Sequence, residues 1–316
     1  MLKRIFKLFN FWSDIKSSQT LMENSFSLSN LYGAARSIIA LSLLSSMIFN
    51  SVDILFPNSL LEDPRYGESW SMFFLLANHL VLAKWITIIV LLIVVSGYFP
   101  RFTGVLQWYV SYSFINSSPI IEGGDQLAAI ISLFLIPVTL MDGRRNHWSP
   151  ITNFELNEKN KIKNITSYFV FMVIKIQVMV VYFHSAIGKI AVNEWADGTA
   201  LYYWLLNPLH GSAEWLRPTL AWLISNGFVL TMLTWSVVIF ELLLSLTILT
   251  SPLNLKFRKR MLVAGVLFHL AIILVHGLVS FCFTMTGALI LFVIPIGYEF
   301  ALKSNIKYHI YLKKLK

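Results

Sequence analysis

Long apolar segments recur along the whole chain, and most charged residues gather in the stretches between them. A helix of about 20 apolar residues crosses the roughly 30 Å hydrocarbon core of a bilayer. Segments near this length span residues 31–56, 72–98, 104–121, 125–141, 166–192, 226–250, 261–278 and 280–298. The pattern predicts an all-α fold, a polytopic membrane helical bundle of about eight transmembrane helices.

Composition agrees with a membrane protein and excludes two kinds of site. Hydrophobic residues make up 56% of the chain and charged residues 13%, whereas about a quarter of the residues of a soluble domain are charged. Cys282 is the single cysteine, so the chain forms neither an internal disulfide nor a CxxC redox pair. No Cys/His spacing suits a metal, and no metal is expected.

The basic residues predict the orientation of the bundle. Nineteen of the 25 Lys and Arg residues fall in the tails and loops on the N-terminal side of the eight-helix plan, and only Arg65 and Arg217 fall in the opposite loops. Because cytoplasmic loops are enriched in Lys and Arg, both termini of this multi-pass cell-membrane protein are expected in the cytoplasm. The net charge of +9 then reflects topology, so membrane lipids and not nucleic acid are the expected partners.

The same pattern divides the chain into three parts. Residues 1–30 form a basic amphipathic segment that is expected on the cytoplasmic membrane surface. Residues 31–300 form the transmembrane domain, and residues 301–316 form a basic cytoplasmic tail.

Charged side chains lie inside the predicted helices, where a charge is costly unless it is paired. Lys175, Tyr182 and Lys189 recur every seven residues, so they share one helix face. Lys175 and Glu241 both lie near mid-depth by their position in the sequence. We therefore predict an intramembrane charge pair between Lys175 and Glu241, whose simplest role is to fix helix packing.

Lys189, near the outer end of its helix, has two interpretations. A terminal lysine can extend its ammonium to the interface and serve only as an anchor. However, Ser185, Ala186 and Gly188 lie within one turn, and small residues let neighbouring helices approach closely. A lysine held in such a crevice loses solvation, which favours a neutral amine that can act as a base.

Other candidate residues are predicted near the same end. Asp125 follows two glycines, and it is either a helix cap or a carboxylate at the depth of that lysine. The loop 193–218 is rich in aromatic residues. It is either an interfacial belt or the roof of a cavity, with Trp195, Asp197 and Trp204 as roof residues.

Two histidines share one face of the segment 261–278. His269 lies mid-span and His276 follows seven residues later. A histidine inside a membrane is usually a hydrogen-bonded packing residue, although two on one face are also consistent with a proton path. His269 is therefore a third candidate catalytic residue beside Lys189 and Asp125.

The segment "VYFHSAIGKIAVNEWADGTALYYWL" resembles the "VYF-x-AG-x-x-K" block, followed by W-x-x-G, of HTTM-domain proteins. This family includes the vitamin K-dependent γ-glutamyl carboxylases and the bacterial SdpB-type proteins. The GGD turn before the span that ends near Asp142, and the segment "FHLAIILVHGLVSFCFTMTGALILF", resemble two further family blocks. The blocks follow in family order between about residues 100 and 297.

The resemblance implies roles for particular residues. In the carboxylases, the lysine that ends the first block is the base that deprotonates a quinol cofactor, and Lys189 matches that position. A quinone is thus the cofactor that the resemblance implies, while the residues themselves leave the cofactor unknown. Gly188 stands where the eukaryotic enzymes have a second lysine, and Asp125 stands near where they have a histidine.

The length and the eight-span plan look more like an SdpB-type protein. By resemblance, such a protein works with a small SdpA-type partner to mature a secreted antimicrobial peptide of the sporulation-delaying type from its precursor. The first hypothesis is therefore a maturation factor with an outward-facing site around Lys189, with or without enzymatic activity as a carboxylase-like or peptide-modifying enzyme. The alternatives are a transporter or immunity-type binding protein, and a quinone- or lipid-dependent modifying enzyme.

Overall fold

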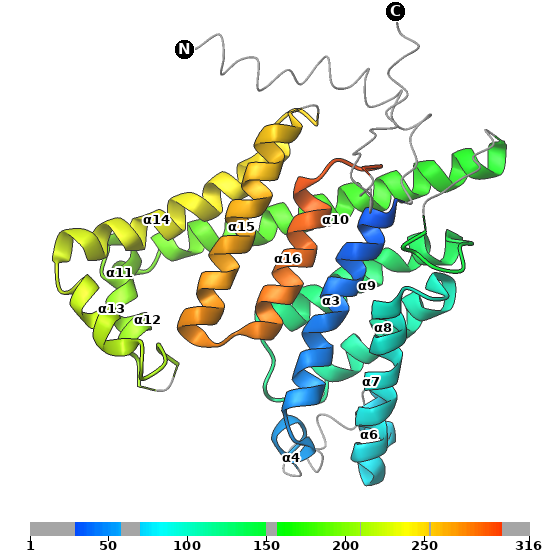
Figure 1. Ribbon diagram of the computed structural model, residues 1–316, viewed down its shortest axis with the longest axis horizontal. Coiled ribbons are helices and arrows are strands. Elements are labelled where there is room, and N and C mark those ends of the chain that lie inside the picture. The colour runs from blue at the N-terminus through cyan, green and yellow to red at the C-terminus, as the bar shows by residue number, and fades with distance from the viewer. Residues whose placement is uncertain (1–28, 58–69, 150–156, 209, 253, 299–316) are drawn as a thin grey trace, which may run out of the picture.

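The computed structural model describes residues 29–57, 70–149, 157–208, 210–252 and 254–298 (Figure 1). The regular elements in these ranges are all helices, which confirms the predicted all-α class. They are α3 (Asn30–Phe49), α4 (Val52–Leu55), α6 (Met72–Leu75), η1 (Ala77–His79), α7 (Leu80–Ser96), α8 (Pro100–Ile115), α9 (Gly123–Met141), α10 (Glu158–Ile190), α11 (Asn193–Ala196), α12 (Ala200–Leu206), α13 (Arg217–Ile224), α14 (Gly227–Leu246), η2 (Thr247–Leu249), α15 (Leu255–His276) and α16 (Val279–Val293).

Each predicted span contains a helix, although the span 72–98 is divided among α6, η1 and α7, and the span 104–121 extends past the end of α8. By length and composition, six helices of the described part can cross a membrane, and α16 is a shorter apolar helix. The count of eight spans and the cytoplasmic termini stay predictions. The proposed N-terminal surface segment, up to residue 28, and the basic tail lie outside the described residues.

Successive long helices run in opposite directions, so their connections gather at two ends of the bundle (Figure 1). At one end Tyr98 bridges to Asn146, and the Arg258 guanidinium donates to the Val293 carbonyl at 2.7 Å. At the other end Ser280 donates to the Glu122 carboxylate at 3.3 Å. We call the end with residues 97–99, 142–149 and 294–298 the basic end, and the end with residues 116–122, 191–226 and 277–278 the far end.

Helix α3 lies at the centre of the bundle. It contributes side chains to both large apolar clusters, one shared with α9, α10 and α16 and the other shared with α6, α7 and α8. Gly287 of α16 allows the closest approach, because a Cβ there would clash with Ile39 and with the Ala35 backbone. The burial of α3 therefore depends on this glycine.

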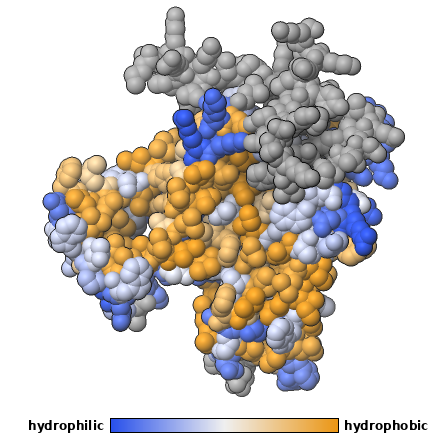
Figure 2. Space-filling view, viewed as in Figure 1, coloured by the Kyte–Doolittle hydropathy of each residue, from blue (hydrophilic) through white to orange (hydrophobic). Residues whose placement is uncertain are grey.

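The outward surfaces of the long helices are apolar. Val263, Leu267 and Leu274 of α15 are each more than half exposed, and the visible face of the molecule is mostly hydrophobic around the middle of the bundle (Figure 2). A soluble monomer rarely exposes so much contiguous apolar surface, whereas lipid-facing helices do. The surface thus agrees with a membrane protein.

Local sequence signals fix several helix ends. Glu122 and Asp125 form a capping box at the start of α9, and the Asn226 side chain accepts from the first N–H groups of α14. Gly277, with φ of 72°, ends α15 in the left-handed conformation. The break predicted between the spans 261–278 and 280–298 thus falls at this glycine.

Candidate functional site

Lys189 and Glu241 form an ion pair between α10 and α14. The Lys189 ammonium donates to the two Glu241 oxygens at 2.9 and 2.7 Å, and to the Ser185 hydroxyl at 2.6 Å. The side chains of the lysine and the glutamate are only 20% and 10% exposed. The Trp195 ring centre lies 5.3 Å from the same ammonium, within the range of a cation–π contact.

A small apolar cluster brings the pair together. Ala186, one turn before Lys189, is fully buried against Trp195, Ala200 and Val238, so α10 approaches α14 closely at this level. Gly188 does not take part, because a Cβ there would meet nothing within 4 Å. The close packing expected from the small residues near Lys189 therefore comes from Ala186.

The predicted pair between Lys175 and Glu241 is wrong. The Lys175 ammonium donates to the carbonyls of Phe292 and Ile294, at the C-terminal end of α16. A helix C-terminus carries unpaired carbonyls and a partial negative charge, so a buried lysine can be satisfied there without a carboxylate. Glu241 is consequently available to Lys189.

A second polar pair extends the site along α10. The Tyr182 hydroxyl lies 2.8 Å from Nε2 of His269, and Glu241 lies within electrostatic range of this hydroxyl. His269 is only 2% exposed, and its Nδ1 has no partner among the described residues. A buried polar atom without a hydrogen-bond partner lowers the stability of the fold by about 1–3 kcal/mol. An apolar side chain would pack here without this cost.

We call Lys189, Glu241, Tyr182 and His269 the lysine centre. Three helices, α10, α14 and α15, supply these side chains. Each of the four is held by a hydrogen bond within the set. The arrangement can hold a proton at several neighbouring atoms inside an otherwise apolar region.

The other predicted site residues lie apart from this centre. The Asp125 carboxylate accepts from the Glu122 backbone N–H at 3.0 Å, and no described contact joins it to Lys189. Asp197 accepts from the N–H and the hydroxyl of Thr199 at 3.1 and 2.6 Å, and Trp204 is 54% exposed. Of the three proposed roof residues, only Trp195 lies over the lysine.

The Glu122 carboxyl is half-buried at the far end. Burial raises its pKa, and the hydrogen bond from Ser280 offsets part of that effect. This group therefore binds a proton more readily than an exposed glutamate.

A buried polar cluster at the basic end was not predicted as a site. The Arg36 guanidinium of α3 donates to two side chains of α8, the Gln107 oxygen and the Thr103 hydroxyl, both at 2.8 Å. The Ser37 hydroxyl lies 3.1 Å from His147 Nε2. Arg36 and Gln107 were visible in the sequence as polar residues inside apolar spans, and that signal could have identified the cluster.

Asp142 holds the loop after α9 to this cluster. It accepts from the Tyr32 hydroxyl and from two nitrogens of Arg144 at 2.9 and 2.8 Å. Burial alone would raise the pKa of Asp142, but the bonds and charge of Arg144 outweigh it and lower that pKa. Burial, reinforced by Arg36 and Arg144, lowers the pKa of His147 to about 3, so this imidazole is neutral at pH 7.

Comparison with known proteins shows the family to which the chain belongs. It is 34% identical over 271 residues to sporulation-delaying protein SdpB of Bacillus subtilis (strain 168), which covers 84% of this chain and 82% of that protein. The chain belongs to the SdpB family. The uncharacterized protein YitO of the same organism is also 34% identical, over 288 residues that cover 90% of this chain and 91% of YitO. No protein-family model and no solved structure matches the chain.

Membership of the SdpB family confirms the predicted closeness to SdpB-type proteins. The wider resemblance to HTTM-domain carboxylases stays a prediction.

Proposed function

We propose that this SdpB-family protein is an integral membrane factor that matures a secreted peptide of the sporulation-delaying type. The observation that carries the proposal is the 34% identity to a sporulation-delaying protein over most of both chains. By the same similarity, the partners are a small SdpA-type protein and the peptide precursor. The lysine centre, at the end expected to face outward, is the proposed site of action.

The lysine centre supports a role in proton transfer. In the observed state the ammonium of Lys189 faces the carboxylate of Glu241. Moving one proton from the ammonium to the carboxylate gives a neutral amine and a neutral acid, and the cost of desolvating charges favours this exchange in an apolar setting. The free amine can then accept a proton from the substrate. The Tyr182 hydroxyl, 2.8 Å from Nε2 of His269, can relay a proton to that imidazole by donating its own proton while it accepts another.

Replacing Lys189 by arginine tests this role. Arginine keeps a positive charge and can hold the Glu241 carboxylate, but it does not release a proton near neutral pH. In cells that make the precursor, the SdpA-type partner and this protein, Lys189→Arg should leave membrane abundance unchanged and abolish mature secreted peptide. The readouts are mass spectrometry of the medium and a membrane blot.

Lys84→Arg is the matched control. The Lys84 ammonium donates to the Asn50 carbonyl at 2.8 Å at the end of α3, so it is another lysine of a membrane helix that serves only to cap a neighbour. This variant should make mature peptide at the wild-type level. Wild-type amounts of mature peptide from Lys189→Arg would overturn the proton-transfer role and leave Lys189 as a packing residue.

The two alternative functions predict different outcomes. A transporter or immunity-type protein with a defective Lys189 would change export of the peptide or the resistance of the producing cell, while the mass of the mature peptide stayed the same. A quinone- or lipid-dependent enzyme would release a bound quinone or lipid on extraction of the purified protein. Measuring peptide mass, resistance and extracted cofactors in the same strains separates these functions.

A further inference from the structure

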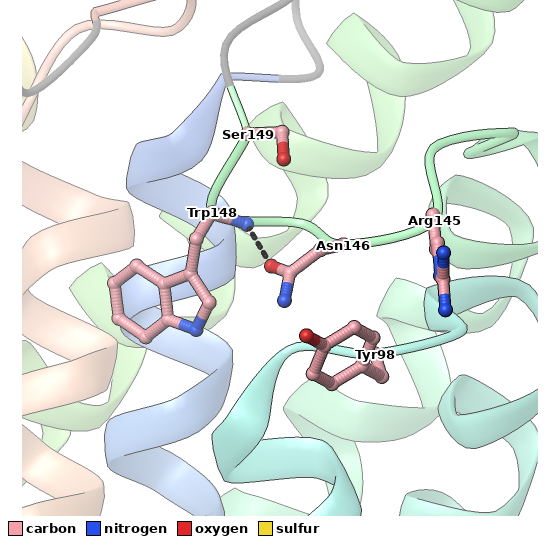
Figure 3. Close-up of a pocket in the computed structure, with 5 residues that line it drawn as sticks. All are labelled: Tyr98, Arg145, Asn146, Trp148 and Ser149. Carbon is pink, nitrogen blue, oxygen red and sulfur yellow. Dashed lines mark hydrogen bonds between the residues drawn. The ribbon is translucent and has the colours of Figure 1, made fainter.

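An open hollow of about 460 Å³ lies at the basic end, away from the lysine centre. Its wall is formed by Tyr98, Arg145, Asn146, Trp148 and Ser149, which come from the connection between α7 and α8 and from the loop after α9 (Figure 3). The volume falls in the range of small-ligand pockets. Nothing in the proposed maturation role uses this hollow.

Three hydrogen-bond donors of the wall are unused. The Arg145 guanidinium, the Tyr98 hydroxyl and the Ser149 hydroxyl have no hydrogen-bond partner among the described residues. The nearby carboxylate of Asp142 is already taken by Tyr32 and Arg144. A positive, donor-rich hollow with no free carboxylate of the described chain favours an anion, and guanidinium groups match the geometry of phosphate oxygens.

The wall is rigid, although it is built from loops. Tyr98 and Asn146 form an antiparallel bridge, and the Phe99 and His147 N–H groups donate across it at 2.9 and 3.0 Å. The amide of Asn146 is held at both ends, because it donates to the Ser96 carbonyl and accepts from the Trp148 N–H (Figure 3). These bonds fix the backbone that carries the donors without a ligand.

Lipid-facing helix surfaces begin directly beside the hollow. Phe102 and Leu106, one turn apart on α8, are 68% and 44% exposed, and Leu140 at the end of α9 is 46% exposed. The Arg101 guanidinium donates to the Leu140 carbonyl at 3.0 Å, so these surfaces adjoin. A phosphate held in the hollow could therefore carry acyl chains that lie along α8 and α9.

We propose that this hollow binds the phosphodiester headgroup of an anionic membrane lipid, with Arg145 contacting the phosphate and Trp148 and Tyr98 flanking it. Basic pockets at the ends of membrane helices commonly hold such headgroups. The site is independent of the lysine centre and of the maturation role.

Native mass spectrometry of the full-length protein in detergent tests the proposal. The protein is titrated with phosphatidylglycerol, with a diacylglycerol that has the same chains but no phosphate, and with inorganic phosphate. The wild type should bind phosphatidylglycerol more tightly than the other two probes. Arg145→Gln should weaken phosphatidylglycerol binding by about tenfold, the effect of one charge-assisted contact at a partly open site.

Arg260→Gln is the matched control, since Arg260 is an exposed arginine on α15 near the basic end and outside the hollow. It removes the same charge and should change the affinity less than about twofold, because a charge outside the hollow acts on the phosphate only through screening solvent. Equal losses in the two variants, or equal binding of phosphatidylglycerol and diacylglycerol, would overturn the proposal. Inorganic phosphate that displaced the lipid and depended on Arg145 would identify a soluble phosphate ligand and overturn the lipid assignment.

Discussion

Separating the Lys189–Glu241 pair should destabilise the bundle more than removing both partners together. Two unit charges about 4 Å apart attract by roughly 4 kcal/mol at an effective dielectric constant of about 20. The Lys189 ammonium lies closer than this to both Glu241 oxygens, at 2.9 and 2.7 Å, so the attraction is at least of this size. Desolvation offsets much of that attraction, so the pair itself adds little net stability. When one partner is removed, the charge that remains keeps its full desolvation cost and has no opposite charge to attract it.

The expected magnitudes follow from burial. Removing one partner of a fully buried pair costs about 3–5 kcal/mol. Since the Lys189 side chain retains 20% of its exposure, we expect roughly 2–4 kcal/mol from Lys189→Met or from Glu241→Gln. The double variant should lose less than either single variant. At roughly 2 °C per kcal/mol for a chain of this size, each single variant should unfold about 4–8 °C below the wild type.

Thermal unfolding of the purified protein in detergent measures this double-mutant cycle. Lys84→Met serves as the control, because the Lys84 ammonium donates to a backbone carbonyl and leaves no charge behind. If the double variant loses as much stability as the two single variants together, the pairing is refuted. The stability losses of independent sites add, whereas those of coupled sites do not.

Three further predictions concern the basic end and the orientation. Because burial lowers the pKa of His147 to about 3, its contribution to stability is complete above the unfolded-state pKa of about 6.5 and is lost as pH falls toward 3. The unfolding temperature should thus drop more between about pH 7.5 and pH 5 in the wild type than in His147→Gln, and parallel profiles would contradict this. Gly97→Ala should lower the expression level and unfolding temperature, because Gly97 has φ of 85° and a Cβ there would clash with Trp148; an unchanged unfolding temperature would contradict it. Reporter fusions at Lys316 and within residues 142–165 should both read cytoplasmic, and an external signal from either would reverse the orientation.

Much of the helical plan followed from hydropathy. Every predicted span contains a helix, because a run of apolar residues in a membrane must satisfy its backbone hydrogen bonds within one segment. Boundaries near glycine and asparagine were also readable, as at Gly277 and Asn226. The short helices α11 to α13 were not resolved in the sequence, because their aromatic residues fit an interfacial loop equally well.

The candidate sites were less predictable, since they depend on which helices meet. Nothing in a single sequence indicates that the loop after α9 folds back toward α3, so Asp142 is not among the predicted site residues. In the structure, its carboxylate accepts from Tyr32 and Arg144 and is almost fully buried. Polar residues inside spans identify the participants of such a cluster, but not their partners.

The error at Glu241 has a geometric cause that also bears on function. Position in the sequence gives the depth of a residue only if all helices end at the same level. Glu241 lies fourteen residues after the start of α14, or about 21 Å along its axis, yet it meets Lys189 at the last turn of α10. Helix α14 must therefore extend well past the end of α10.

That overhang determines the surroundings of Lys189. The short helices α11 and α12 pack beside the extended part of α14, where Trp195 and Ala200 join Val238 in one cluster and a Cβ on Gly198 would clash with Thr231. A lysine at a helix end that met the interface directly would need no such cover and would be largely hydrated. Here the cover and the contact with Glu241 leave the Lys189 side chain only 20% exposed. This is why we assign Lys189 to chemistry at the lysine centre and not to anchoring, and why an arginine at this position is the decisive substitution.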